Sequence, residues 1–164
     1  MGGRLALRAA ASAPERVTRL VLLSTTAGVE DAAQRLAADE RLAGEIEHAT
    51  IEEFIASWRT TPLFDADPAW VHEEIAADTR RLTPAEIAAN LRALGPGSLP
   101  SLWDRLPALT MPSVVLAGER DARYCEIAAR LAASLPAAQL RIVPGAGHRL
   151  ALEAPEAVAE AIAG

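Results

Sequence analysis

Two polar side chains with complementary proton chemistry each follow an apolar run of the sequence. Asp121 ends the segment LAGERD, which follows one apolar run. His148 lies in the glycine-rich segment VPGAGHRL, which follows the next apolar run. A carboxylate beside an imidazole orients the ring and stabilises its charged form during proton transfer. The two segments therefore predict a general base, His148, supported by Asp121.

Each residue also has an interpretation without catalysis. His148 alone would be a surface loop histidine, and Asp121 alone would be the N-cap of the helix after it. Gly145 and Gly147 around the histidine, together with the position of the aspartate, favour the catalytic interpretation. Cys125 begins the same helix, where thiol pKa values can be lowered, but a lone cysteine is more often inert.

The elements that carry this pair are typical of an α/β fold. Short apolar runs at residues 17–24, 111–118 and 138–145 predict buried parallel strands. Predicted helices at 124–135 and 155–163 alternate with the last two strands. Because ligand sites of open α/β sheets lie at the carboxyl ends of the strands, we expect Asp121 and His148 to meet there.

A long helical stretch interrupts this pattern. After the first strand, helical periodicity predicts four helices, at residues 32–46, 51–59, 69–80 and 84–94. Another predicted helix, at residues 1–13, precedes that strand. We therefore predict a core of residues 1–28 and 95–164, and a helical cap, or lid, of residues 29–94.

Composition narrows the functional classes. The 164 residues carry a net charge of −6, which argues against nucleic-acid binding because phosphates are neutralised by clustered basic residues. No apolar run is long enough to span a membrane, and the first residues lack the pattern of a signal peptide. The single cysteine, Cys125, cannot form an internal disulfide, so we expect a cytoplasmic protein.

The predicted sheet has a free edge. The strand at residues 17–24 is apolar like a central strand, yet the chain offers it a neighbour on one side only. Such an edge associates readily with other strands. We therefore expect it to take up either a complementing N-terminal half or a second copy of the chain.

The order of the chemical segments resembles the α/β-hydrolase family, in which a serine, an acid and a histidine follow one another. In that family the serine lies in a Gly-x-Ser-x-Gly turn between a strand and a helix. The first residues, MGGRLALRAAASAPERVTRLVLLST, are similar to the segment directly after this serine, and GERD and GAGH are similar to the acid and base loops. The resemblance covers the whole chain and implies an incomplete α/β-hydrolase fold: C-terminal parallel strands, flanking helices and a helical cap.

A narrower resemblance is to the 2-succinyl-6-hydroxy-2,4-cyclohexadiene-1-carboxylate synthases, lyases of menaquinone biosynthesis that eliminate pyruvate. It rests on GGR at the start, ADERLA and SWRTTPLF in the cap, and above all GSLPSLWDRLPALTMPSVVLAGERDARY. The resemblance implies that a serine, made basic by the histidine and the acid, removes a substrate proton. Electron flow then expels pyruvate, and no metal or organic cofactor takes part.

The same resemblance implies a set of substrate contacts. Arg4, Arg35 and Trp58 match residues that contact the carboxylate-rich substrate in that family, and a further arginine matches Arg80 or Arg81, of which we take Arg81 as the candidate. Several guanidinium groups suit several carboxylates. Without such roles, Arg35 would be a solvated helix residue and Trp58 an apolar anchor of the cap.

The resemblance also locates the parts of the family site that these 164 residues lack. Met1 matches the position directly after the family's serine, so its backbone amide would be one donor of the oxyanion hole. Because the serine itself and the loop with the second donor are absent, we expect the chain alone to be inactive. It would be either the C-terminal part of a full synthase, or a half-protein or non-catalytic binding module. The alternative enzyme is a generic ester or C–C hydrolase.

Overall fold

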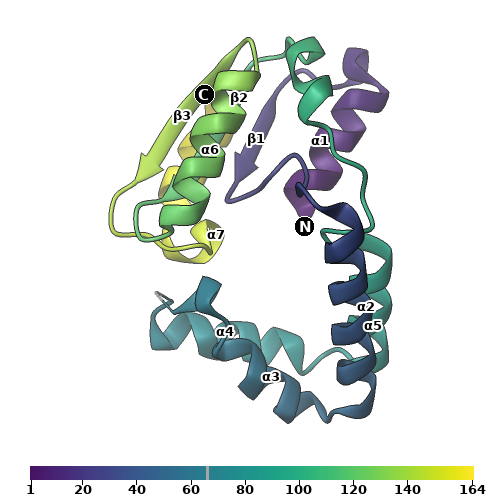
Figure 1. Ribbon diagram of the computed structural model, residues 1–164. Coiled ribbons are helices and arrows are strands. Elements are labelled where there is room, and N and C mark those ends of the chain that lie inside the picture. Colours follow the sequence, from purple (N-terminus) through teal and green to yellow (C-terminus); the bar gives the residue numbers. More distant parts are fainter. Residues whose placement is uncertain (66) are drawn as a thin grey trace. The chain divides into compact units, whose positions relative to one another are not determined.

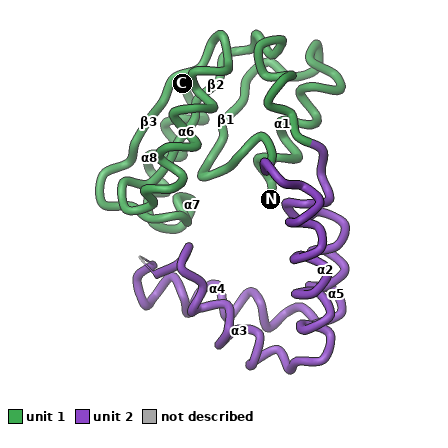
Figure 2. Tube along the Cα trace, viewed as in Figure 1, with its two compact units in different colours: residues 1–28, 101–164 green, residues 29–100 purple. Residues whose placement is uncertain are grey.

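The computed structural model describes residues 1–65 and 67–164, and it divides into two compact units (Figure 2). The sheet unit comprises Met1–Gly28 and Ser101–Gly164, and the helical unit comprises Val29–Pro100. The second boundary falls after Pro100 rather than after residue 94. The residues between belong to the helical unit because they bond back to it: the amide of Gly97 donates to Asp39 Oδ2 (3.0 Å) and Ser98 Oγ to the carbonyl of Ala93 (3.1 Å).

The sheet unit contains three parallel strands in the order β1-β2-β3. They are β1 (Leu20–Leu23), β2 (Ser113–Gly118) and β3 (Ala138–Val143). β1 is shorter than the predicted strand at residues 17–24. The amide of Leu20 donates to the carbonyl of Pro112 (3.0 Å), but Pro112 has no N–H with which to continue the ladder toward residue 18.

Helices cover both faces of this sheet (Figure 1). On one face, α1 (Gly2–Ser12) and α6 (Ala122–Ser134) pack against side chains such as Leu22 and Val115. On the other face, α7 (Leu150–Glu153) and α8 (Pro155–Ala163) pack against Val114 and Leu116. Successive strand residues therefore enter opposite layers of core, as expected of a buried parallel sheet. Two 3-10 helices complete the unit, η1 (Pro14–Arg16) and η3 (Trp103–Ala108).

The helical unit consists of four α-helices and one short 3-10 helix among its described residues. These are α2 (Ala32–His48), α3 (Ile51–Arg59), η2 (Pro62–Phe64), α4 (Ala69–Thr79) and α5 (Pro84–Leu94). The predicted range 29–94 also includes position 66, which lies outside the described residues. Thr50 and Thr83 begin α3 and α5 with capping boxes, in which threonine and the glutamate three residues later bond each other's backbone amides.

Two further features bear on association with other molecules. Within the described residues, β1 pairs with β2 on one side and with no strand on the other, although Leu20 and Leu22 are buried. None of the helices in this part of the chain combines the length and the apolar character that a bilayer crossing requires.

Candidate active site

Asp121 and His148 meet at the carboxyl edge of the sheet. Asp121 follows β2 and His148 lies in the loop after β3, so two neighbouring parallel strands bring them together. His148 Nδ1 lies 2.6 Å from Asp121 Oδ2, and the side chains are 19% and 6% exposed. An ionised carboxylate can only accept, so Nδ1 carries the proton and Nε2 is the basic nitrogen of the neutral ring. We call these two residues the acid–histidine pair.

The two oxygens of Asp121 have different partners. While Oδ2 binds the imidazole, Oδ1 accepts a hydrogen bond from the amide of Tyr124 (3.1 Å) and so caps α6. Asp121 is therefore both the N-cap of α6 and the partner of His148. Capping also orients the carboxylate, because it fixes one oxygen at the start of a helix.

Tyr124 was not predicted as part of this site. Its ring contacts the imidazole of His148 edge-on, with the ring centroids 4.6 Å apart. It lies in the first turn of α6, three residues after Asp121, so the helix that Asp121 caps also carries an aromatic wall for the histidine. Nothing in the sequence pattern marks Tyr124, because the contact depends on where the loop after β3 passes.

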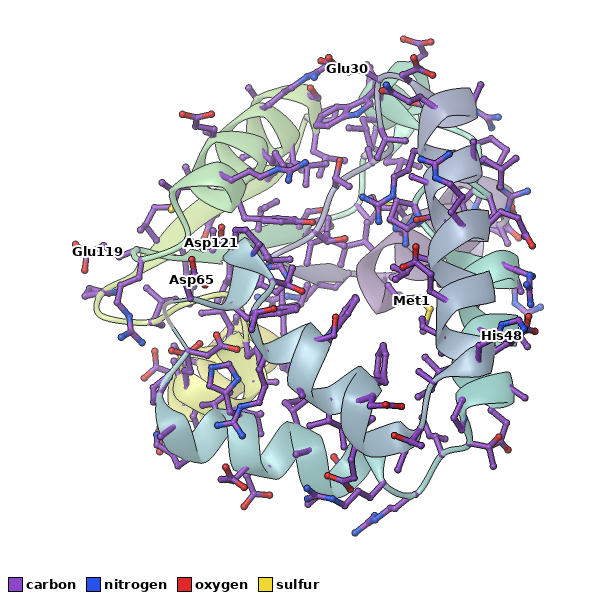
Figure 3. The ribbon with its side chains drawn as sticks, turned by 60° about the horizontal axis from the view of Figure 1, so that its bottom comes forward. Met1, Glu30, His48, Asp65, Glu119 and Asp121 are labelled. Carbon is purple, nitrogen blue, oxygen red and sulfur yellow. The ribbon has the colours of Figure 1, made fainter. Side chains whose placement is uncertain are left out.

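Close backbone approach explains the glycines around the pair. A Cβ at Gly118, the last residue of β2, would lie 2.1 Å from the carbonyl oxygen of Gly147 and 2.4 Å from that of Ala146. Gly145 has a φ of +67°, in the region that favours glycine. The loop that carries His148 can therefore cross the end of β2 only over a glycine. In Figure 3, Glu119 and Asp121 lie on the loop that joins β2 to α6.

Cys125 lies beside the pair without joining it. Its thiol donates to the carbonyl of Gly118, with a sulfur–oxygen distance of 3.2 Å. Burial, and then the charges of Asp121 and Glu119, raise the pKa of the Cys125 thiol above its ordinary value. This direction is opposite to the lowering that a helix start favours.

Met1 and Arg4 lie at the beginning of α1. Met1 is exposed, and its carbonyl accepts a hydrogen bond from the amide of Arg4 (3.1 Å). A Cβ at Gly3 would lie 2.6 Å from the side chain of Thr25, so the start of α1 lies against the loop after β1. The first turn of α1, where Figure 1 marks the N-terminus, is therefore at the same carboxyl edge as the acid–histidine pair, and this turn carries Arg4, which is buried. The oxyanion role of the Met1 amide stays a prediction.

Ser24 lies at this edge too, but not in the geometry of a nucleophile turn. It follows β1 with a φ of +39°, and its buried Oγ has no hydrogen-bond partner among the described residues. No glycine adjoins it, and the next helix begins only at Ala32. A family nucleophile requires a direct turn from strand to helix. Ser24 therefore does not supply one.

The other predicted substrate contacts belong to the helical unit. Arg35, on α2, is 44% exposed and donates from Nε to Asp39 Oδ1 (2.7 Å). Trp58, on α3, is half-buried, with ring centroids 5.4 Å from Phe54 and 5.6 Å from Phe64. This aromatic cluster fits the interpretation of Trp58 as an apolar anchor of the cap.

Arg80 and Arg81, at the end of α4, differ in their partners. Arg80 donates from Nε (2.8 Å) and Nη2 (3.0 Å) to the two carboxylate oxygens of Glu52. Arg81 is 80% exposed and lies 3.6 Å from Asp78. The planar fork of Arg80 is thus engaged within the unit, whereas Arg81 is the more open of the two. In the described part of the chain, no three His, Cys, Asp or Glu side chains are grouped so that they could hold a metal ion.

The chain belongs to the alpha/beta hydrolase family, which it matches over residues 1–161. Among its relatives is a putative 2-succinyl-6-hydroxy-2,4-cyclohexadiene-1-carboxylate synthase of Bacillus subtilis, 36% identical over 161 residues that make up 94% of this chain and 59% of the relative. The predicted α/β-hydrolase fold and the resemblance to these synthases are both confirmed.

Solved structures agree with this assignment. MenH from S. aureus superposes with a TM-score of 0.91 at 30% identity, over 98% of this chain and 62% of that one. A thermophilic esterase from Thermogutta terrifontis, with malate bound, superposes with a TM-score of 0.78, also at 30% identity, over 98% of this chain and 60% of the esterase. The chain thus spans about 60% of the length of the proteins it matches, as expected of an incomplete fold.

Proposed function

We propose that this chain supplies the acid and the base of a Ser-His-Asp site that eliminates pyruvate in 2-succinyl-6-hydroxy-2,4-cyclohexadiene-1-carboxylate synthesis, in the cytoplasm. The observation that carries the proposal is the 2.6 Å contact between His148 Nδ1 and Asp121 Oδ2 at the carboxyl edge of the sheet. The relatives of this name at 36% and 34% identity support the choice of reaction.

In the proposed reaction, proton transfer passes through Nε2 of His148. Asp121 holds Nδ1, so Nε2 takes the proton from a serine hydroxyl. The serine oxygen then removes a proton from the substrate, the electron pair of that C–H bond moves into the ring system, and the bond to the pyruvate oxygen breaks. Asp121 stabilises the imidazolium until Nε2 gives its proton to the departing pyruvate enolate.

The serine of this reaction must come from outside residues 1–164. In the family pattern it directly precedes the position of Met1, and Ser24 lacks the required turn. Loss of the nucleophile removes several powers of ten in turnover. We therefore expect the 164-residue chain to be inactive by itself, and active when joined to a segment that supplies the serine.

Arginines at two places support a carboxylate-rich substrate. Arg4 lies at the carboxyl edge of the sheet. Arg35 is held through Nε by Asp39, which leaves its terminal nitrogens to bind a carboxylate. Trp58 and Arg81 complete the proposed set of contacts. Like Arg4 and Arg35, they stay predictions until tested by substitution.

Substitution of these arginines tests the synthase against its alternative, an ester or C–C hydrolase. The Thermogutta esterase, at 30% identity, is the observation that favours this alternative. The test uses the chain extended by the residues encoded upstream of Met1. In it, Arg4→Ala and Arg35→Ala should lower kcat/KM for pyruvate release about 10- to 100-fold, because each removes a charge-assisted contact.

Two exposed arginines on the same helices provide matched controls. Arg8→Ala on α1 and Arg41→Ala on α2 should leave pyruvate release unchanged, since both side chains are exposed. If the extended protein releases no pyruvate but hydrolyses esters, or if Arg4→Ala and Arg35→Ala have no effect, the synthase proposal is wrong.

A further inference from the structure

One buried carboxylate holds the backbone on both sides of His148. Glu153 is the last residue of α7, and its side chain is only 3% exposed. Its Oε2 accepts a hydrogen bond from the amide of Gly147 (2.9 Å), and its Oε1 accepts one from the amide of Arg149 (3.2 Å). The two donors are the residues directly before and directly after the histidine.

The same carboxylate also reaches the loop that carries the acid. Arg120, which directly precedes Asp121, donates from Nη2 to Glu153 Oε2 (2.6 Å). The backbone amide of Arg120 donates to the carbonyl of Ala146 (2.9 Å), two residues before His148. Neighbours of both members of the acid–histidine pair are thus joined through one glutamate.

A second glutamate joins the two loops farther from the pair. The amide of Glu119 donates to the carbonyl of Val143 (3.0 Å), and its Oε2 accepts from the amide of Gly145 (2.9 Å). Glu119 is exposed, so water can replace these side-chain contacts at small cost. Glu153 is nearly enclosed, and the amide of Gly147, a buried residue, would lose this acceptor if the carboxylate were removed.

We propose that Glu153 is a positioning residue for the acid–histidine pair. Its carboxylate, held in turn by Arg120, fixes the backbone around His148 so that Nδ1 points at Asp121 Oδ2. Catalytic geometry has to be held within about 0.5 Å, which requires support of this kind behind the reacting groups. The inference rests on the proposed role of His148, but its test needs neither substrate nor serine.

The test is an NMR measurement on the complete 164-residue chain. The proton on His148 Nδ1 should give a downfield signal, because it is shared with a carboxylate in a short hydrogen bond. In Glu153→Gln this signal should move upfield or disappear. Hydrogen exchange of the Gly147 and Arg149 amides should become faster, on the order of tenfold, because they lose a charged acceptor.

A matched control separates position from charge. Glu160→Gln removes the same charge from an exposed site on α8 and should leave the signal in place. A role limited to stability would lower the free energy of unfolding of Glu153→Gln but keep the Nδ1 signal unchanged in the folded molecules. That outcome would overturn the proposal.

Arg120 provides a second variant in case Glu153→Gln does not fold. Arg120→Ala keeps both amide donors to Glu153 but removes the ion pair, so we expect a smaller displacement of the same signal. The control is Arg123→Ala, an exposed position on α6. An unchanged signal in folded Arg120→Ala would contradict the proposal if Glu153→Gln is unfolded. Failure of the synthase assignment would leave all these NMR results unaffected.

Discussion

The sheet unit and the helical unit use their charged side chains in different ways. In the sheet unit, the nearly buried carboxylates of Asp121 and Glu153 accept hydrogen bonds from backbone amides as well as from side chains. In the helical unit, Arg80 and Arg92 form ion pairs across the exposed surfaces of neighbouring helices. Asp39 is an exception there, since it is buried and bonds the amide of Gly97.

The apolar cores of the two units also differ, and the core of the sheet unit is the larger. Two large clusters cover the faces of the sheet, whereas the cluster of the helical unit is built on Ala43, Ile46 and Ala88. Surface ion pairs contribute little to stability, while buried carboxylates that bind amides fix local geometry. The comparison indicates that polar contacts position a site in the sheet unit, and that in the helical unit they mainly supplement a small core.

Gly118→Ala should have the largest effect of these substitutions, because it destabilises the sheet unit. The added methyl group would lie 2.1 Å from a backbone carbonyl oxygen, that of Gly147, which cannot move without displacing the His148 loop. We expect a loss of about 2 to 3 kcal/mol in the free energy of unfolding, measured by urea denaturation.

The matched control for this variant lies in the helical unit. Gly44→Ala, within α2, meets nothing within 4 Å. Alanine favours a helix over glycine, so this change should stabilise by up to about 1 kcal/mol. Equal losses for the two glycines would refute the contrast between the units.

Acid should unfold the helical unit before the sheet unit. Four of its glutamates have pKa values held below the ordinary value, by hydrogen bonds from arginine or from capping backbone: Glu47, Glu52, Glu53 and Glu86. A carboxyl group of this kind stabilises the fold above its unfolded pKa, and the stabilisation is lost as the pH falls through the lower, folded pKa. Amide protection measured between about pH 5 and pH 2 should disappear first in α2, α3 and α5. Earlier loss in β2 and β3 would contradict this.

A single capping box should have a smaller effect. Thr83→Ala removes the hydroxyl that accepts from the amide of Glu86 at the start of α5, and should cost about 1 kcal/mol. Thr79→Ala is the control, because the Thr79 hydroxyl only donates to the carbonyl of Ile75 within α4. Urea denaturation that finds the two variants equally stable would count against the capping role.

The surface ion pairs should matter least. Arg92 donates hydrogen bonds to Glu40 (2.9 Å) and Glu47 on α2. These bonds raise the pKa of Arg92 above its ordinary value, and the bond to Glu47 has the larger effect. Arg92→Ala should nevertheless destabilise only slightly, and roughly 1 M salt should abolish the difference from the parent chain. Arg41→Ala, at an exposed position on α2, serves as the control. A large, salt-insensitive loss for Arg92→Ala would contradict our view of this unit.

Much of the fold could be predicted because its elements have strong local patterns. Helices α3, α5 and α8 begin and end at the predicted residues. The shortening of β1 was missed, because it depends on Pro112, which lies far along the chain, directly before β2. The four residues of α7 are too few for helical periodicity to be recognised.

The acid–histidine pair was predictable for a topological reason. Parallel strands place the loops after them at one edge, so two loops after neighbouring strands must approach each other. Tyr124 and Glu153 were not predictable, because their contacts depend on how closely these loops pass. Arg80 was not separable from Arg81 either, since its partner Glu52 lies 28 positions away.

The division of labour between the two oxygens of Asp121 has a consequence for the interpretation of related sequences. One oxygen serves the start of α6 and the other serves the imidazole. A related protein without catalytic activity would still be stabilised by an aspartate at this site, because the side chain caps a helix. An aspartate at this position in a distant homologue is therefore weak evidence that the homologue is catalytically active. A histidine at the position of His148 is stronger evidence.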